Sequence, residues 1–286
     1  MTDYAILTND IPVTRNRAAV MQQLRRLLPG IEGFHDPLPL GLPAIDSYLP
    51  AGGLLCGALH EVVPAIQAAF PAAFGFIAAI LARISSRPAC GRGMRQGMTT
   101  MGAEHPVILV MPAYGRHQYG RPHGHGLNRL GLDPGRLIVV ETAHRKETLW
   151  AMTEALRSGV PAAVAGMIDK LDLKTSQKLH LAAMNSGLPL LLLRPATPAS
   201  CGGGSAAATR WRIGTALAAR DRFGLYARPR WHLQLERCRN GRPGEWVVEY
   251  DHVAHRFSLA AALADPSLSR RAGDQSTSDR SIRSVR

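Results

Sequence analysis

The eight residues 64–71, between a predicted strand and a predicted helix, occupy the place where nucleotide-binding α/β proteins bind phosphate. The motif found there, G-x-x-x-x-G-K-[ST], wraps phosphates with backbone N–H groups, brings a lysine to the outer phosphates and holds magnesium with a hydroxyl. This chain has PAIQAAFP instead. Pro64 has no N–H group and cannot adopt a positive φ, and Ala69 adds a Cβ where the backbone must approach closely. Phe70 replaces the lysine and Pro71 replaces the hydroxyl residue, so the sequence predicts a degenerate phosphate loop.

The elements that would position this loop are still predicted by the pattern of apolar residues. A short apolar helix is expected at residues 42–49, and a partly buried strand at residues 58–63. Behind the loop, apolar residues recur at steps of three and four, and Pro71 is tolerated in the first turn of a helix. The apolar positions of this helix are Phe70, Phe74, Ile77, Leu81 and Ile84.

Several segments of the chain resemble known families. Residues 38–71, LPLGLPAIDSYLPAGGLLCGALHEVVPAIQAAFP, are similar to the segment around the phosphate loop of RecA-type recombinases, and this similarity continues over residues 107–195. The degenerate loop, together with TRWRIG from Thr209 and RCRNGRPGEWVVEYDHVAHRF from Arg237, resembles the ImuA family. Members of that family are RecA-like proteins of bacterial mutagenesis cassettes that DNA damage induces. The resemblance covers residues 38–263.

The RecA-like resemblance implies two catalytic carboxylates that the chain lacks. In RecA-like ATPases a water-activating glutamate follows the strand expected here at residues 107–111, where this chain has a proline and an alanine. An aspartate that orders magnesium would end the strand expected at residues 162–168, and the matching position holds Gly166. Asp169 comes three residues later, and a strand rises about 3.3 Å per residue, so we expect its carboxylate to be misplaced and Asp169 to be a loop or capping residue. The expectation is no catalytic residue, no bound cofactor and no ATP hydrolysis.

Strands and helices alternate along the middle of the chain. Runs that are apolar on both faces predict buried strands, and their alternation with helices predicts a mostly parallel sheet with right-handed crossovers. Further strands are expected at residues 137–140 and 188–193, and helices at residues 146–158 and 172–186. With the resemblance, the expected class is α/β, with a RecA-like P-loop-type fold in which helices flank a central sheet.

The C-terminal part has a different pattern. Trp231, Leu233 and Leu235 alternate with polar residues, as do Trp246, Val248 and Tyr250 in a second run, and Asn240-Gly241 lies between the two runs. This pattern predicts an antiparallel hairpin that extends the sheet. The expected organisation is an N-terminal helical segment at 1–36 with a helix at 14–28, a RecA-like core at 37–196, a flexible linker at 197–209, the hairpin extension at 210–264 and a disordered basic tail at 265–286.

The net charge of +13 and the isoelectric point near 10.4 favour polyanionic partners, DNA above all. A chain rich in Ala, Gly, Pro and Arg from a GC-rich gene would explain the same charge. Arginine and tryptophan are enriched in binding hot spots. The candidate partner or DNA contacts around the hairpin are Arg228, Arg230, Arg237, Arg239 and Arg242, beside Trp211, Trp231 and Trp246. We interpret the tryptophan rings as core residues and leave the arginines open between a contact surface and a solvated rim.

The remaining titratable residues exclude some classes of site. His117, His123 and His125 lie in the segment 114–126, where a metal site is conceivable, but they have no cysteine or acidic residue beside them. A flexible basic loop without a metal is the favoured interpretation, and a second mobile loop is expected at residues 90–105.

The four cysteines have no paired spacing, which is typical of a reduced cytosolic chain. No secretory signal is recognised, and no uninterrupted apolar run reaches the roughly 18 residues of a membrane span. The expected location is therefore the cytoplasm, at the nucleoid.

The resemblance to the ImuA family implies a non-catalytic adaptor in the SOS response to DNA damage. Its implied partners are ImuB, which is a catalytically inactive Y-family polymerase homologue, an error-prone DNA polymerase III alpha-type subunit and RecA, with DNA as a further candidate. Three alternatives come from other classes: an SOS cell-division inhibitor of the SulA type, an active DNA-dependent RecA-like ATPase, and a simple DNA-binding module. Co-purification with the division GTPase would favour the division inhibitor. ATP turnover stimulated by single-stranded DNA would favour the ATPase. Steeply salt-sensitive DNA binding would favour the DNA-binding module.

Overall fold

The computed structural model of the chain describes residues 35–86, 105–196, 204–218, 223, 225 and 228–260. The helix expected at residues 14–28 and the basic tail expected at residues 265–286 lie outside the described residues. The same holds for all but the last residue of the loop expected at residues 90–105.

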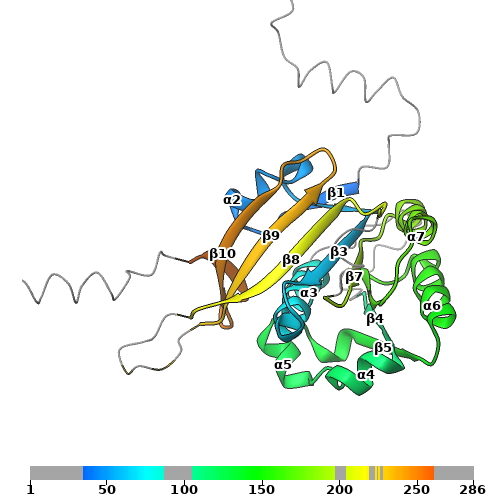
Figure 1. Ribbon diagram of the computed structural model, residues 1–286, viewed down its shortest axis with the longest axis horizontal. Helices are drawn as coiled ribbons and strands as arrows, with labels where there is room; N and C mark the ends of the chain where they lie inside the picture. The colour runs from blue at the N-terminus through cyan, green and yellow to red at the C-terminus, as the bar shows by residue number, and fades with distance from the viewer. Residues whose placement is uncertain are drawn as a thin grey trace, which may run out of the picture.

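The described strands form two sheets (Figure 1). The larger has nine strands in the order β11-β10-β9-β8-β3-β7-β6-β4-β5, and the smaller pairs β1 with β2. All neighbours from β8 to β5 are parallel, and all neighbours from β8 to β11 are antiparallel. The mixed α/β class with a mostly parallel sheet is thereby confirmed. The strands are β1 His35–Leu38, β2 Leu54–Cys56, β3 Leu59–Pro64, β4 Val107–Pro112, β5 Leu137–Thr142, β6 Ala163–Met167, β7 Leu190–Leu193, β8 Thr209–Ala216, β9 Arg230–Cys238, β10 Gly244–Asp251 and β11 Arg256–Leu259.

The predicted strands of the parallel half are all present. Every residue of β3, β6 and β7 is buried, as expected for strands with a helix layer on each face. The sequence predicted that the strand now seen as β3 would be only partly buried, but even its two polar residues, His60 and Glu61, are fully buried. The edge strand β5 is more open, with Ile138 49% exposed.

Helices cover both faces of the parallel strands. Helix α3, Phe70–Ser85, packs on one face against β3, β6, β7 and β8. Helices α6, Arg145–Ser158, and α7, Leu173–Ser186, pack side by side on the other face (Figure 1). Gly159 and Gly187 end α6 and α7 in the left-handed conformation that favours glycine, and the Asp172 side chain caps the first turn of α7. These helices confirm the three longest helical predictions in the described part of the chain.

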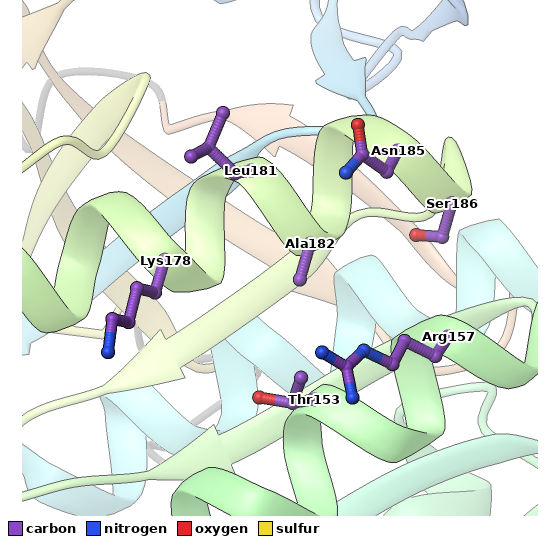
Figure 2. Close-up of a pocket in the computed structure, with 7 residues that line it drawn as sticks. All are labelled: Thr153, Arg157, Lys178, Leu181, Ala182, Asn185 and Ser186. Atoms are coloured by element: carbon purple, nitrogen blue, oxygen red, sulfur yellow. The ribbon is translucent and has the colours of Figure 1, made fainter.

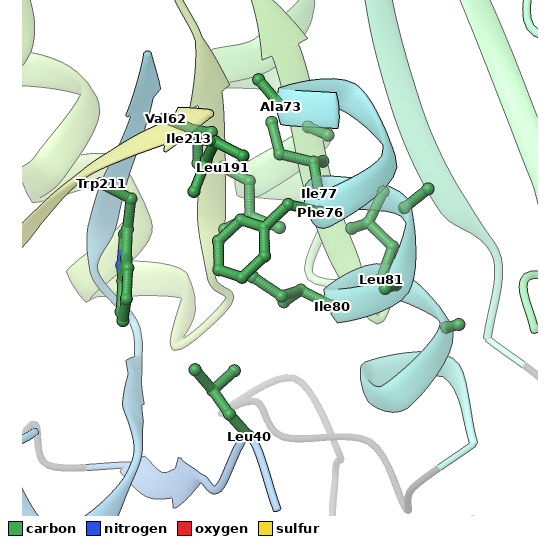
Figure 3. Packing of buried hydrophobic residues seen from close by; sticks show 14 of the residues in the cluster. Leu40, Val62, Ala73, Phe76, Ile77, Ile80, Leu81, Leu191, Trp211 and Ile213 are labelled. Carbon is green, nitrogen blue, oxygen red and sulfur yellow. The ribbon is translucent and has the colours of Figure 1, made fainter. Parts of the chain in front are cut away.

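Helix α3 is buried around almost its whole circumference. Phe76 has no exposed surface, and its ring lies 5.5 Å from the ring of Trp211 and 5.9 Å from the ring of Phe257. Figure 3 shows the Phe76 ring pointing from α3 toward the strand that carries Trp211. Phe74, which the periodicity placed on the core face, is only half-buried. The core therefore includes the face between the predicted apolar positions, because strands of the sheet pack against this helix and the loop before β2 reaches it, where the Arg83 side chain donates to the Pro39 carbonyl at 3.3 Å.

The predicted antiparallel hairpin is confirmed as β9 and β10, and it is part of a larger unit. Strand β8 pairs with β3 on one side and with β9 on the other, so it joins the parallel and antiparallel halves. The turn between β9 and β10 contains Asn240 at φ 61, and Gly241, where a Cβ would approach the Tyr48 carbonyl oxygen to 2.4 Å. Glycine is required at that position because any larger residue would displace the backbone of residue 48.

Two loop predictions are wrong where the structure describes them. Residues 114–126 lie largely in two helices, α4 Ala113–Tyr119 and α5 Gly124–Arg129. The expected linker 197–209 is described from residue 204 onward, where residues 205–208 are buried and β8 begins at Thr209. There the Ala206 N–H donates to the Ser176 hydroxyl at 3.0 Å and the Ala208 N–H donates to the Leu59 carbonyl at 2.7 Å. Small residues allow this close packing, so composition alone was misleading.

Short elements complete the described chain. Helix α2, Pro43–Asp46, confirms the short helix expected near residues 42–49, and the Asp46 carboxylate accepts from the N–H groups of residues 40–42. Three 3-10 turns span Pro50–Gly52, Gln67–Ala69 and Pro134–Arg136. The segment Gln67–Ser85 has the length and apolarity of a membrane span, but 78% of its most apolar 18-residue stretch is buried inside the fold, which is the behaviour of a core helix.

Candidate functional site

The carboxyl ends of the parallel strands meet at one edge of the sheet, the edge at which open α/β sheets bind ligands. Strand β3 ends there at Pro64 and strand β4 at Pro112. The segment 64–71 leaves β3, makes the 3-10 turn Gln67–Ala69 and enters α3 at Phe70. Pro71 lies in the first turn of α3, as predicted. The strand, loop and helix thus follow the expected order, and the side chains of the loop decide what it can bind.

The Phe70 ring stacks on the ring of Tyr119 from α4. The two centroids lie 3.4 Å apart and the ring planes differ by 5°. The Gln67 side-chain amide donates to the Tyr119 hydroxyl, and partial burial raises the pKa of that hydroxyl above its usual value. The position at which a phosphate loop carries its lysine is here one half of an aromatic stack that joins the loop to α4.

A cavity of about 430 Å³ lies beside this stack. Phe74 from α3, Met111 from β4 and Met167 from β6 line it, together with residues of α4 and of the segment that follows it. No carboxylate is among its lining residues in the described part of the chain. The thioether and aromatic groups on its walls suit an apolar group. Gln118, Arg121 and His123 also line it, and Arg121 pairs with Glu141.

Gly166, the position predicted to have lost a magnesium-binding acid, faces away from this cavity. A Cβ at Gly166 would lie 2.3 Å from the Met152 sulfur of α6, on the opposite face of the sheet. Side chains alternate along a strand, and the neighbouring Met167 is the residue of β6 that lines the cavity. A carboxylate at residue 166 would therefore point at α6. Met167, and not Gly166, is the residue of β6 whose side chain faces the cavity. Asp169 lies in the turn after β6, where its carboxylate accepts from the Lys170 N–H, as a loop residue would.

The histidines of residues 114–126 are spread over α4, the residue that precedes α5, and α5 itself. The His123 and His125 rings lie 5.5 Å apart, and His117 is in the last turn of α4. The structure brings no three His, Cys, Asp or Glu residues together in a metal-binding arrangement within the residues it describes. The geometry therefore gives no support to the metal alternative there.

A buried charge cluster around Glu61 of β3 was not predicted from the sequence. Glu61 has no exposed surface, and its carboxylate lies 3.3 Å from Nη1 of Arg194 and 2.8 Å from Nη2 of Arg210. The Ser205 hydroxyl donates to the other carboxylate oxygen. The signals available in the sequence were a glutamate within an apolar strand and an arginine directly after Leu193, which ends a run of four leucines. The cluster joins β3, β7 and β8 under the segment 205–208.

His60, the neighbour of Glu61, is held neutral in a chain of buried hydrogen bonds. Its Nε2 faces the Leu55 carbonyl at 2.8 Å and therefore carries the proton, so its Nδ1 accepts from the Thr209 hydroxyl at 2.8 Å. The Thr209 oxygen in turn accepts from the Trp211 indole N–H at 3.0 Å. Burial lowers the pKa of His60 to about 4, because the cation would be desolvated.

Acidification is expected to weaken the fold through His60. Between pH 6.5 and about 4 the unfolded chain binds a proton that the folded chain does not, so stability falls as the pH falls. For this pKa difference the loss between pH 7 and pH 5 is about 2 kcal/mol of unfolding free energy. Urea unfolding at the two pH values measures it. A His60→Gln variant should show a smaller difference between the two pH values, and an equal difference would contradict the assignment.

The five candidate arginines do not form one surface. Arg230 is buried and pairs with Glu249 at 2.5 Å, and Arg228 pairs with Asp251 at 3.0 Å near the start of β9. The other three, Arg237, Arg239 and Arg242, are exposed around the β9–β10 turn at the far end of the hairpin. A contact role for Arg230 is thus excluded by its burial, and the described structure leaves the turn as the exposed arginine cluster.

These turn arginines make few constraining contacts. Arg237 donates to the Ser205 carbonyl at 2.7 Å, and the Arg242 guanidinium lies 4.6 Å from the centre of the Tyr48 ring. Arg239 is close enough to α7 to lower the pKa of His180, after the larger effect of burial. The tryptophans lie under this surface, because Trp211 and Trp231 are buried and Trp246 packs half-buried against Tyr48. Their predicted core role is confirmed.

Comparison with known proteins gives one family. No protein-family model matches the chain. The chain is 34% identical over 253 residues to the protein called Protein ImuA from Caulobacter vibrioides strain NA1000 / CB15N, which covers 82% of this chain and 93% of that relative. The protein of the same name from Caulobacter vibrioides strain ATCC 19089 / CIP 103742 / CB 15 matches with the same identity and coverage.

Proposed function

Because the chain belongs to the ImuA family, we propose that it is a non-catalytic, RecA-like adaptor that assembles a translesion synthesis complex in the SOS response to DNA damage. Its partners in this proposal are an ImuB-type polymerase homologue, RecA and an error-prone DNA polymerase III alpha-type subunit. It works in the cytoplasm, at the nucleoid. The chain contributes binding surfaces, and its partners contribute the polymerase chemistry.

The observation that carries the proposal is the Phe70–Tyr119 stack at the carboxyl edge of the sheet. An aromatic ring at the lysine position supplies no positive charge for a phosphate, and Pro71 supplies no hydroxyl for magnesium. The cavity beside the stack is lined mainly by apolar and aromatic side chains, and Arg121, which also lines it, pairs with Glu141, which adds to the same conclusion. Together these features support a degenerate phosphate loop in a RecA-like fold and oppose the DNA-dependent ATPase alternative.

Family membership weighs against the SulA-type alternative, since the relatives that cover most of the chain carry the ImuA name. A division inhibitor would bind the division GTPase and ignore polymerase-type partners. Pull-down of the chain from cells with damaged DNA separates these two functions. Recovery of the division GTPase without an ImuB-type protein would reject the adaptor function.

The exposed turn arginines are expected to contribute to partner or DNA binding. Replacing Arg237, Arg239 and Arg242 by alanine should weaken binding to RecA, to an ImuB-type protein or to single-stranded DNA by about tenfold, because arginine is frequent in binding hot spots. The melting temperature should change by no more than about 2 °C, since these side chains lie at the surface. Pairwise affinity measurements with the full chain check this prediction.

The matched control is Arg228→Ala, which removes an exposed arginine that pairs with Asp251 near the opposite end of β9. It should leave all three affinities unchanged. If the triple variant also binds all three partners like the wild type, the turn arginines are a solvated rim. A large loss of stability in the triple variant would instead assign them a structural role.

A further inference from the structure

A hollow of about 560 Å³ lies between α6 and α7 on the side that faces away from the sheet. Thr153 and Arg157 line it from α6, and Lys178, Leu181 and Ala182 line it from α7. Figure 2 shows the Arg157 guanidinium extending along α6 toward Thr153, with the small Ala182 side chain facing the same space from α7. The floor is shallow because Ala182 and Thr153 are short, so the two helices leave room for an inserted side chain.

Two helical stripes flank this groove. On α6, Trp150, Thr153 and Arg157 follow one another at steps of three and four and so share one side of the helix. Trp150 is 66% exposed, while Met152 and Leu156 of the same helix are buried against the sheet. Large exposed aromatic side chains on a well-packed helix are typical anchors of protein interfaces.

The stripe on α7 combines an apolar residue with positive charge. Lys174, Lys178 and Leu181 follow at steps of four and three, and Leu181 is 50% exposed. Helix α7 contains no aspartate or glutamate between its first and last residues. On α6, Arg157 pairs with Glu154 at 2.9 Å, but both side chains are exposed, and such pairs are worth little and exchange readily. The groove thus joins two exposed apolar groups with an excess of cations.

We propose that the α6–α7 groove binds an amphipathic, acidic helix of the ImuB-type partner, and this rests on the proposed adaptor function. An apolar side chain of that helix lies over Ala182, between Trp150 and Leu181. Carboxylates on the flanks of the same helix pair with Lys178 and Arg157. This is the helix-in-groove mode of recognition, in which anchors at steps of three, four and seven residues enter an apolar groove.

Charge argues against other occupants of the groove. The N-terminal segment of this chain carries Arg15, Arg17, Arg25 and Arg26 where its helix is predicted, so it would bring cations to a cationic surface. A second copy presenting its own α6–α7 face would do the same. DNA fits the cations, but it does not fit the exposed Trp150 and Leu181 that flank the groove, which a phosphate backbone would leave in water.

The test uses the full-length chain labelled with 5-fluorotryptophan and the unlabelled ImuB-type protein encoded in the same genome. Fluorine NMR should show four tryptophan resonances, and a Trp150→Phe variant identifies that of Trp150. Adding the partner should shift or broaden the Trp150 resonance most, because the other three rings are buried or half-buried in the fold. An unchanged Trp150 resonance in a formed complex would overturn the proposal.

Affinity measurements with variants complete the test. Leu181→Asp and the double variant Arg157→Glu, Lys178→Glu should each weaken partner binding by about tenfold or more. Leu259→Asp, an equally exposed leucine on β11 at the opposite edge of the sheet, should bind like the wild type. If the wild type binds the partner and the groove variants bind it equally well, the groove assignment fails and the adaptor function stands.

Two further outcomes are decisive. If the wild type does not bind the ImuB-type protein at all, the adaptor function itself fails. If the groove variants lose affinity for a single-stranded oligonucleotide but keep their affinity for the ImuB-type protein, the groove is a nucleic-acid surface and the proposal is overturned.

Discussion

Replacing Glu61 by alanine is expected to lower the free energy of unfolding by about 3–5 kcal/mol. The change leaves the Arg194 and Arg210 guanidinium groups buried without the carboxylate that lies between them. Their desolvation is then no longer offset by the charge of Glu61, which is far more costly than the loss of an exposed ion pair. The Ser205 hydroxyl also loses its acceptor, so the packing of the segment 205–208 over α7 should loosen.

Equilibrium unfolding in urea measures this loss, and Glu154→Ala is the matched control. Glu154 also pairs with an arginine, Arg157, but both side chains are exposed, so the change should cost less than about 1 kcal/mol. Replacing Glu61, Arg194 and Arg210 together by methionine should recover much of the stability, since no charge is then left buried. A loss below about 1 kcal/mol for Glu61→Ala would mean that the cluster does not hold β3, β7 and β8 together.

Replacing Phe76 by alanine is expected to lower the free energy of unfolding by about 3–5 kcal/mol. Phe76 has no exposed surface and packs from α3 against Trp211 of β8 and Phe257 of β11. The change removes a whole ring from the contact between the helix and both halves of the sheet, and the rigid neighbours cannot close the cavity. Thermal or urea unfolding measures the effect.

The control for Phe76 is Phe74, two positions earlier on the same helix. Phe74 is half-buried and borders the cavity at the carboxyl edge of the sheet, so alanine there should cost about 1–2 kcal/mol. The apolar periodicity alone predicts the reverse order, with Phe74 in the core at a cost of about 3 kcal/mol. Equal losses at the two positions, or a larger loss at Phe74, would contradict the packing described for α3.

Periodicity predicted the main elements because their patterns are unambiguous. The run Leu190–Leu193 is apolar at every position, and the Asn240-Gly241 turn separates two alternating runs, so a buried strand and a hairpin were both predictable. The mostly parallel order of strands followed from the alternation of strands and helices. The role of β8 as the joint between the two halves did not, because its neighbours β3 and β9 are set by long-range packing.

The failures have identifiable physical causes. The segment 205–208 consists of small residues that are typical of linkers, but small residues also pack closely, and here they lie over Ser176 and Glu61. The burial of Glu61 depends on Arg194 and Arg210, which are more than a hundred residues away in the chain, so a glutamate within an apolar strand did not by itself identify its partners. Arg230 looked like its exposed neighbours in composition, and only the pairing of β9 with β10 brings it to Glu249.

The candidate site was predictable in part. The identity of residues 64–71 and their place between β3 and α3 followed from the sequence, and the structure confirms that order of elements. The Phe70–Tyr119 stack was not predictable, because residues 114–126 were expected to form a loop and not the helices α4 and α5. The face of Gly166 was also not predictable, since it depends on the position of Met152 across the sheet.

The most direct test of the adaptor account is a measurement of ATP hydrolysis by the purified full-length chain, with and without single-stranded DNA. The account predicts phosphate release no faster than in a matched sample without protein, under conditions in which the chain binds its ImuB-type partner. Turnover at the rate of an active recombinase, or a tightly bound nucleotide beside Phe70, would contradict the account.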